Sequence, residues 1–280
     1  MNNLRKIFTA TGYDLYYSIS NPKIWAAVVL ILTTVFVDYS GYILMIADFD
    51  LPVSIGIISG LFTDPFFVMI AFTGLLLIFS EMPFNDPQQV FMITRCGKRA
   101  WCISQILYII AVSAFVMLSI FAFTMIIFAG HLTFDDTWGR IIPAANNTEI
   151  YSKYPIHLSI SSYIISSLTP REALIYSVPI ALFTFVTFGC LIFALNTMSR
   201  KIAGTIIGAI FVAENWIAVY LPYSWVPWVT MLGWCSLNRI NFAHIGTNPR
   251  PEHAYIMLSG ISVLSVAVVL FHSRKKTDVL

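Results

Sequence analysis

Two carboxylate side chains lie inside long apolar stretches, where an ionisable group is costly. Asp38 belongs to the run VVLILTTVFVDYSGYILMI, and Glu214 belongs to IIGAIFVAENWIAV, where Asn215 follows it. A carboxylate at the centre of a bilayer costs about 2.5–3.5 kcal/mol on insertion scales. Two interpretations stay open. Either these three side chains line a translocation path, or each carboxylate is satisfied by a neighbour such as Asn215 or Tyr39 and serves packing. We expect no basic partner for either carboxylate inside a membrane span.

The motifs of nucleotide, metal and hydrolase sites are absent from the sequence. A phosphate-binding loop needs GxxxxGK[ST]. The nearest match, around Gly97-Lys98, has Met92 in place of the first glycine and Arg99 in place of the serine or threonine. Neither HExxH nor GxSxG occurs. The five histidines are dispersed, whereas a metal site needs several converging ligands. We therefore expect no catalytic residue, no metal site and no ATP-binding loop in this chain.

A polar segment, PFNDPQQVFMITRCGKRAW at residues 83–101, separates two long apolar runs. Asp86 can cap a helix that begins at Pro87, because the first helical position needs no backbone donor and proline presets its φ. Gly97 can end this helix about three turns later. We interpret residues 86–97 as a helix that docks a soluble partner. The alternative is a positively charged loop that only sets orientation.

The composition is that of an integral membrane protein. Of the 280 residues, 58% are hydrophobic and 11% are charged, and the mean hydropathy is +0.79. Soluble domains carry about 25% charged residues. Several apolar runs exceed the ~18 residues that indicate a bilayer-spanning helix. We predict an all-α protein with a single transmembrane domain (1–280) and six spans, at about 24–46, 65–80, 101–129, 173–195, 202–219 and 255–271.

Three further segments complete the predicted architecture. Residues 3–19 gather apolar side chains on one helical face, which is typical of an amphipathic helix in the membrane interface. Residues 130–172 form a long, polar outer loop. Residues 220–242 crowd tyrosines and tryptophans around two prolines, which favours a broken, re-entrant segment before the last span. The alternative for this third segment is a plain aromatic belt around the span ends.

The distribution of basic residues predicts the orientation. If the N-terminus is inside, the inner segments are the shorter ones and hold most lysines and arginines, including Arg95, Lys98 and Arg99. The positive-inside rule then places both termini in the cytoplasm. We expect a multi-pass protein of the cell membrane, in the plasma membrane of a bacterium.

This order of parts resembles the membrane subunits of ABC exporters of the type-2 permease family, which have six spans and no ATPase of their own. The resemblance rests on four segments, and it covers nearly the whole chain. They are the amphipathic helix 3–19, the capped basic helix in PFNDPQQVFMITRCGKRAW, the basic turn NTMSRK between the fourth and fifth spans, and the aromatic segment 220–242. The likeness is one of architecture, with a loose ITRCGKRAW match to the family's basic stretch before the third span.

The resemblance implies a permease subunit that carries no cofactor and works with a separate ABC ATPase subunit, which binds ATP and Mg²⁺. The residues expected to dock that subunit are Asp86, Gln88, Phe91, Arg95, Lys98 and Arg99. A second permease chain, identical or related, would complete the path for outward movement of an amphipathic peptide, lipid-like molecule or drug. No nucleic-acid partner is expected. The alternative function is an intramembrane enzyme or a membrane sensor partner, which would act without nucleotide.

Overall fold

The computed structural model describes residues 3–83, 87–147, 150, 153–199, 202–242 and 247–274. Within these ranges the chain is helical apart from connecting loops and one pair of two-residue strands. The elements, in chain order, are α1 (Asn3–Ile19), α2 (Pro22–Phe49), β1 (Val53–Ser54), α3 (Ile57–Leu61), α4 (Pro65–Phe79), α5 (Pro87–Cys96), α6 (Lys98–Ile127), β2 (Leu132–Thr133), α7 (Ile141–Ala144), α9 (Ser162–Ser167), α10 (Pro170–Met198), α11 (Ala203–Ile217), α12 (Val226–Val229), the 3₁₀ helices η1 (Leu232–Cys235) and η2 (Leu237–Arg239), and α13 (Pro251–Arg274).

Prolines and short polar caps decide where the helices begin. Helices α2, α4, α5, α10 and α13 each start at a proline, the residue whose missing N–H costs least at this position. Asn21, Asp64 and Thr169 precede three of these prolines, and each side-chain oxygen accepts a bond from a backbone amide two or three residues on. Glu172 completes the last of these caps by accepting a bond from the backbone amide of Thr169 at 2.8 Å. These starts follow from local chemistry alone.

Four helices, α2, α6, α10 and α13, are long and apolar enough to cross a membrane. Helices α4 and α11 are also apolar, but each has 15 residues. At 1.5 Å per residue they measure about 22 Å, which is less than the ~30 Å hydrocarbon core. All six occupy the ranges that the sequence predicts for spans. The prediction of an all-α membrane protein is confirmed, and within the described part of the chain length and composition support four spans.

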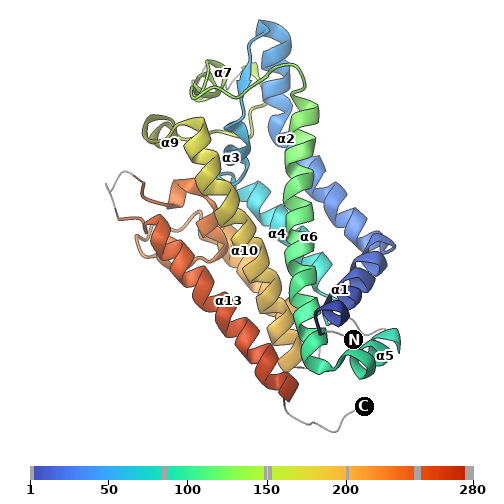
Figure 1. Ribbon diagram of the computed structural model, residues 1–280. Coiled ribbons are helices and arrows are strands. Elements are labelled where there is room, and N and C mark those ends of the chain that lie inside the picture. The colour runs from blue at the N-terminus through green and yellow to red at the C-terminus, as the bar shows by residue number, and fades with distance from the viewer. Residues whose placement is uncertain are drawn as a thin grey trace.

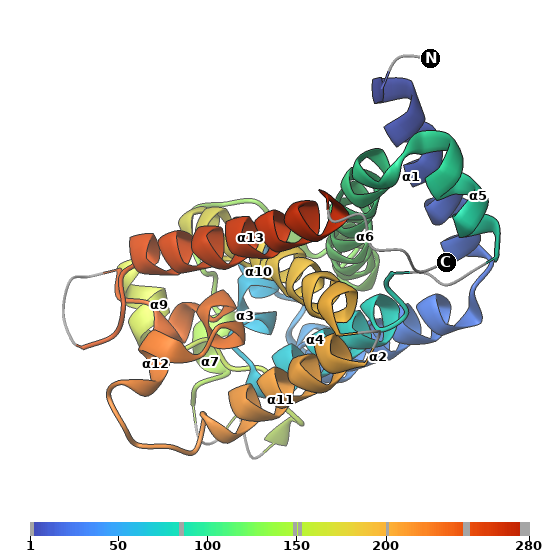
Figure 2. The same ribbon diagram turned by 90° about the horizontal axis from the view of Figure 1, so that it is seen from below.

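Helix α10 lies at the centre of the bundle. It packs against α4, α6, α11 and α13, and it is the most buried of the four long helices. Helix α4 packs between α2 and α11, as the view along the bundle shows (Figure 2). Helix α13 lies on the outside of the bundle and is the least buried of the four. The bundle is therefore built outward from α10.

The two ends of the bundle differ in structure (Figure 1). At one end lie α1, α5, the start of α6 and the C-terminal ends of α10 and α13. We call this the basic end, because Arg95, Lys98 and Arg99 lie here. At the other end lie α3, α7, α9 and the aromatic segment 220–242, and we call it the loop end.

The segment expected as a long polar outer loop contributes a large part of the core. Ile156, Leu158 and Ile160 alternate with exposed residues and are buried, as in an extended chain with one face on the protein. The carbonyl of Leu158 accepts a hydrogen bond from Tyr42 Oη at 2.9 Å, which ties the segment to α2. The described residues between 130 and 172 thus form a packed cap on the loop end, and their polar composition conceals a periodic apolar face.

The same cap joins the chain that follows α2 to the chain that follows α6. Strands β1 and β2 pair in parallel, with Val53 opposite Leu132 and Ser54 opposite Thr133. The backbone amide of Val53 donates to the carbonyl of His131 at 2.8 Å. The loop-end termini of α2 and α6 are therefore held side by side.

The aromatic segment 220–242 is broken into α12, η1 and η2, as its prolines predict. Trp234 is buried, and its Nε1 donates to the carbonyl of Pro227 at 2.8 Å. Tyr223 and Trp225 stack on each other and are exposed. Helix η1 packs on α10 and α11, so the segment is anchored by its buried tryptophan while other aromatic rings face outward.

Asn196 joins three helices near the basic end. From α10, its Nδ2 donates to the carbonyl of Met82 after α4 at 2.7 Å, and its Oδ1 accepts from the amide of Gly204 in α11 at 2.8 Å. A Cβ at Gly204 would collide with the Ile192 carbonyl and the Asn196 side chain. Close approach of α10 and α11 at this point therefore requires glycine.

We predict that Asn196→Ala destabilises the protein by roughly 2–6 kcal/mol, because it leaves two buried backbone groups without a partner at roughly 1–3 kcal/mol each. The measurement is thermal loss of the monodisperse species in detergent, followed by size-exclusion chromatography. Ser199→Ala is the matched control, since the exposed Ser199 hydroxyl bonds only to the Leu195 carbonyl of its own helix. Equal losses in the two variants would contradict the assigned role of Asn196.

Candidate functional site

A cationic surface lies at the basic end, on α5 and the first turn of α6. Arg95, Lys98 and Arg99 are exposed, and Phe91 is 70% exposed beside them. Among the described residues no carboxylate lies within 4 Å of these three cations. We call these four residues the docking surface. It combines unpaired positive charge with an exposed aromatic ring.

The position of Lys98 and Arg99 on their helix is electrostatically unfavourable. Both lie in the first turn of α6, where the helix dipole is positive and where no acidic residue is present. A cation at this position is opposed by the dipole, by typically 0.3–1 kcal/mol. An anionic partner would relieve this repulsion, so the docking surface is suited to an acidic group from outside the chain.

Gly97 is the joint between α5 and α6. Its φ of 86° and ψ of 147° lie in a region open essentially to glycine alone. Its amide donates to Ile93 at 2.8 Å, and its carbonyl accepts from Trp101 at 3.1 Å. The two helices are thus joined by a single residue whose conformation sets the angle between them.

A polar seam fastens α1 to α6 beneath the docking surface. One face of α1 supplies buried polar side chains at a spacing of three and four residues. The bonds of this seam run from Thr11 Oγ1 to the Ser104 carbonyl (3.3 Å), from Gln105 Nε2 to Asp14 Oδ2 (2.7 Å) and from Ser18 Oγ to Tyr108 Oη (2.7 Å). The face of α1 next to the seam exposes Leu4, Phe8, Tyr16 and Ile19. The amphipathic helix therefore has its polar face on the protein and an apolar face free to meet lipid.

The acidic member of the seam is Asp14, which lies outside the membrane-spanning helices. Burial raises the pKa of Asp14 to about 7, and the hydrogen bond from Gln105 acts in the opposite direction. Asp14 is thus the one group of the seam that can change charge near neutral pH.

The residues expected to dock an ATPase fall into two groups. Phe91, Arg95, Lys98 and Arg99 share the docking surface. Asp86 lies outside the described residues, and so does the side chain of Gln88, whose backbone belongs to α5.

Asp38 lies on α2 with its side chain buried and only 1% of the residue exposed. Its Oδ2 has no hydrogen-bond partner in the described part of the chain. The hydroxyl of Tyr39, considered above as a possible partner, shares a 3.3 Å hydrogen bond with Thr124 instead. The carboxylate of Asp64, which caps α4, is close enough to repel that of Asp38 electrostatically.

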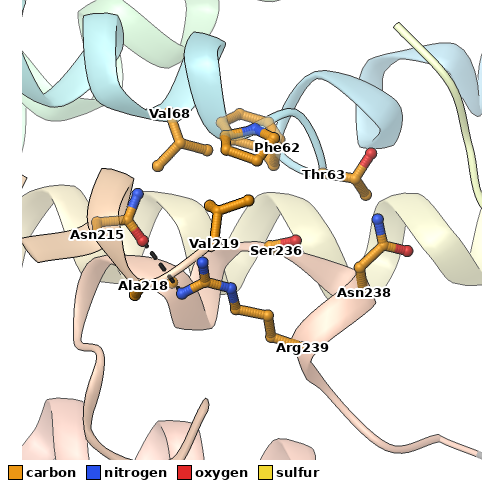
Figure 3. A pocket seen from close by; sticks show the side chains of 11 residues that line it. Phe62, Thr63, Val68, Asn215, Ala218, Val219, Ser236, Asn238 and Arg239 are labelled. Carbon is orange, nitrogen blue, oxygen red and sulfur yellow. Dashed lines mark hydrogen bonds between the residues drawn. The ribbon is translucent and has the colours of Figure 1, made fainter. Parts of the chain in front are cut away.

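Asn215 lies at a pocket at the loop end, between α4, α11 and the aromatic segment (Figure 3). The pocket has a volume of about 220 Å³. Arg239 Nη1 donates to Asn215 Oδ1 at 3.3 Å and to Thr230 Oγ1 at 3.1 Å. The residues lining the pocket are Phe62, Thr63, Pro65, Val68, Asn215, Ala218, Val219, Gly233, Ser236, Asn238 and Arg239.

Gly233 and Glu214 define the surroundings of the guanidinium. Gly233 lies directly against it, and a Cβ at this position would collide with Arg239 Nη1. Glu214 attracts Arg239 electrostatically, but no ion pair within 4 Å joins them. Arg239 comes from the segment that follows the span, so the sequence expectation, which concerned only residues within a span, did not consider it.

The three residues expected to line a path are not brought together in this chain. Asn215 lines the pocket, Glu214 and Asp38 do not, and α4 lies between the helices of Asp38 and Asn215. The residue that sequence reasoning missed is Arg239, the only charged residue between 220 and 242. A lone charge in an apolar, aromatic stretch must find polar partners, and that rule could have identified it.

Comparison of the chain with protein-family models, curated proteins and solved structures found no match. Among the described residues, no group of three or more histidine, cysteine, aspartate or glutamate side chains is placed to hold a metal ion. The two features of the chain that bear on its function are the docking surface at the basic end and the pocket at the loop end.

We predict that the polar seam is pH-sensitive. Because burial raises the pKa of Asp14 above its ordinary value near 3.9, the folded protein binds this proton more tightly than the unfolded chain does. The stabilisation is complete below about pH 4 and is lost as the pH rises through about 7. Backbone amides of α1 should exchange with deuterium faster at pH 8 than at pH 5.5, after correction for intrinsic exchange.

Asp14→Asn should abolish this difference, because an amide cannot ionise and still offers an oxygen to Gln105. Asp135→Asn, a change at an exposed position of the loop end, is the control and should keep the pH dependence. A pH effect that persists unchanged in Asp14→Asn would rule out this residue as its source.

Proposed function

We propose that this chain is the permease subunit of an ATP-driven exporter of the type-2 ABC family, with its basic end in the cytoplasm. The observation that supports this most is the docking surface, a cationic and aromatic patch on α5 and the first turn of α6, which forms no ion pair with the described residues. Such a patch fits the acidic, partly apolar groove of a soluble partner, because complementary charge steers association and a buried aromatic ring anchors it.

The contacts around α5 suit the transmission of movement. Helix α5 packs on α1 and α6, and Cys96 Sγ lies 3.9 Å from the carbonyl of Lys6, to which it donates. The polar seam fastens α1 to α6, and α6 packs against α2, α10 and α13. A displacement of α5 by the ATPase would therefore reach several membrane helices. The ATPase must bind two states of the bundle with different affinity for this displacement to bias transport.

The distribution of charge supports the proposed orientation. At the basic end the described acidic groups are few: Asp14 is buried, and Glu81 pairs with Lys23. At the loop end, carboxylates are numerous and exposed. At the basic end, the lysines and arginines whose side chains the structure describes are Arg5, Lys6, Lys23, Arg95, Lys98 and Arg99. By the positive-inside rule this end faces the cytoplasm, and both termini lie on that side. The membrane in this proposal is the plasma membrane of a bacterium.

In this proposal α4 and α11 complete a set of six spans, and a second permease chain encloses the path for an amphipathic substrate moved outward. The short length of α4 and α11 is compatible with spanning, because residues that follow α3 and residues of the aromatic segment line the pocket at their loop-end termini. The aromatic segment would enter the outer leaflet, where its backbone is shielded by α10 and α11.

The docking surface provides a direct test. We predict that the triple variant Arg95→Glu, Lys98→Glu, Arg99→Glu lowers recovery of an ABC ATPase, co-purified from native membranes and identified by its Walker A peptide, by at least about tenfold. Reversed charge would repel an acidic groove at three contacts, and close charge pairs contribute about 1.5–7 kcal/mol each at protein interfaces.

The control is a double reversal at exposed positions of the loop end, Arg140→Glu with Arg250→Glu, which should leave recovery unchanged. Recovery of the ATPase with the triple variant at the wild-type level, or its absence from the wild-type chain, would defeat the proposal. Activity of the purified wild-type chain without nucleotide would favour the intramembrane enzyme instead.

The joint at Gly97 gives a second test. Gly97→Ala forces a side chain into a backbone conformation that costs of order 1–3 kcal/mol for residues other than glycine. No atom lies within 4 Å of the added Cβ, so the effect is confined to the backbone. We predict that α5 reorients and that the ATPase rate of the reconstituted complex falls several-fold.

Gly12→Ala in α1 is the matched control, because a Cβ there also meets no atom within 4 Å and Gly12 is helical without a positive φ. Its ATPase rate should equal that of the wild-type complex. Equal rates for all three complexes would show that the angle between α5 and α6 has no part in coupling.

A further inference from the structure

The guanidinium of Arg239 uses only part of its donor capacity within the protein. Arginine presents five N–H donors in a fixed, planar fork. The two hydrogens of Nη1 serve Asn215 and Thr230. Among the described residues Nε and Nη2 have no acceptor and no carboxylate lies within 4 Å. The free edge of the fork, Nε with Nη2, is the edge that binds a carboxylate or phosphate group in bidentate fashion.

The guanidinium projects into the pocket, toward the space between Phe62, Val219 and Ser236 (Figure 3). The bonds to Asn215 and Thr230 hold it in this position, and Gly233 provides the room that it occupies. The free edge is therefore preorganised. Little conformational entropy is lost when a ligand binds a side chain that is already fixed.

Two further donors face the same space. Ser236 is buried and lines the pocket, and among the described residues its hydroxyl makes no side-chain hydrogen bond. Asn238 Oδ1 accepts a bond from Ser161 at 2.7 Å, which leaves its Nδ2 as a donor. None of the lining residues is an aspartate or a glutamate. The polar part of the pocket is thus rich in donors and lacks a negative charge of its own.

One side of the pocket is apolar, and an exposed aromatic residue follows it in the sequence. Phe62, Val68 and Val219 form one side of the pocket, and Tyr220 follows directly with 69% of its surface exposed. Glu214 offsets the charge of Arg239 only through space. A partly buried cation without a paired anion is costly, and a bound anion would remove this cost.

We propose that this pocket binds one oxyanion group, a carboxylate or a phosphate, through the free edge of Arg239 with Ser236 and Asn238. The inference stands whether or not the chain is an exporter. Two sources offer the same chemistry at the loop end of a membrane protein: the headgroup of an anionic lipid, and a free anion from the aqueous phase.

The test uses the purified full-length chain in detergent and has two arms. In the first, native mass spectrometry measures saturable binding of phosphatidylglycerol, with phosphatidylcholine as the comparison lipid. In the second, equilibrium dialysis with radiolabelled inorganic phosphate measures binding of the free anion. Saturable, one-to-one binding in the first arm identifies a lipid headgroup, and in the second arm it identifies a soluble anion.

Three variants decide whether Arg239 is responsible. Arg239→Gln removes the charge and should weaken binding by about tenfold or more. Arg239→Lys keeps the charge but loses the fork, and should weaken binding several-fold. Gly233→Ala displaces the guanidinium without changing any charge, and should also weaken binding. Arg140→Gln, at an exposed position elsewhere on the loop end, should bind as the wild type does.

Folding of each variant is checked by size-exclusion chromatography, and the lysine and alanine variants keep the test decisive if Arg239→Gln does not fold. The proposal is overturned if the wild-type chain binds neither probe. It is equally overturned if every folded variant of Arg239 and Gly233 binds as tightly as Arg140→Gln.

Discussion

Hydrocarbon offers no hydrogen-bond partner, and the bundle is arranged so that the ends of its two short helices find partners within the protein. Asp64 caps the start of α4, and Asn196 binds the carbonyl that follows its end. The same Asn196 side chain accepts the amide of Gly204 in α11, while Asn215, near the other end of α11, accepts a bond from Arg239. Helix α10 supplies Asn196 and contacts both short helices, so one side chain of the central helix binds backbone groups next to both of them.

The structural features that could be predicted from the sequence are those that depend on residues close together in the chain. Prolines, polar caps and long apolar runs are local, and the six apolar helices, α1 and α5 begin and end within a few residues of the predicted ranges. The burial of Ile156, Leu158 and Ile160 could not be predicted from composition, because their partner surface lies on helices more than a hundred residues earlier. Arg239 could have been singled out as a lone charge in an apolar stretch, but its partner Asn215 belongs to another element, so the pocket that they line could not be predicted from neighbouring residues.

One part of the candidate site at the basic end could also be predicted from the sequence, and another part could not. Arg95, Lys98 and Arg99 are close in sequence, so their common surface could be anticipated from the spacing. The polar seam between α1 and α6 could not, because it joins residues about ninety positions apart. The two features belong together physically: the exposed cations are presented by α5 and the start of α6, and the buried seam makes α1 part of the same unit. A partner that binds the cations therefore meets three connected helices.

The parallel pairing of β1 with β2 has a mechanical consequence. It joins the segments that follow the loop-end termini of α2 and α6 through main-chain hydrogen bonds. A relative rotation of the two helices would therefore pivot about this strand pair. Helix α6 has 30 residues and is about 45 Å long. A tilt of α6 by roughly ten degrees about this pivot would move its far terminus by roughly 8 Å. The strand pair, which lies at the pivot, would move much less. The displacement is thus largest at the end of α6 to which α5 is joined.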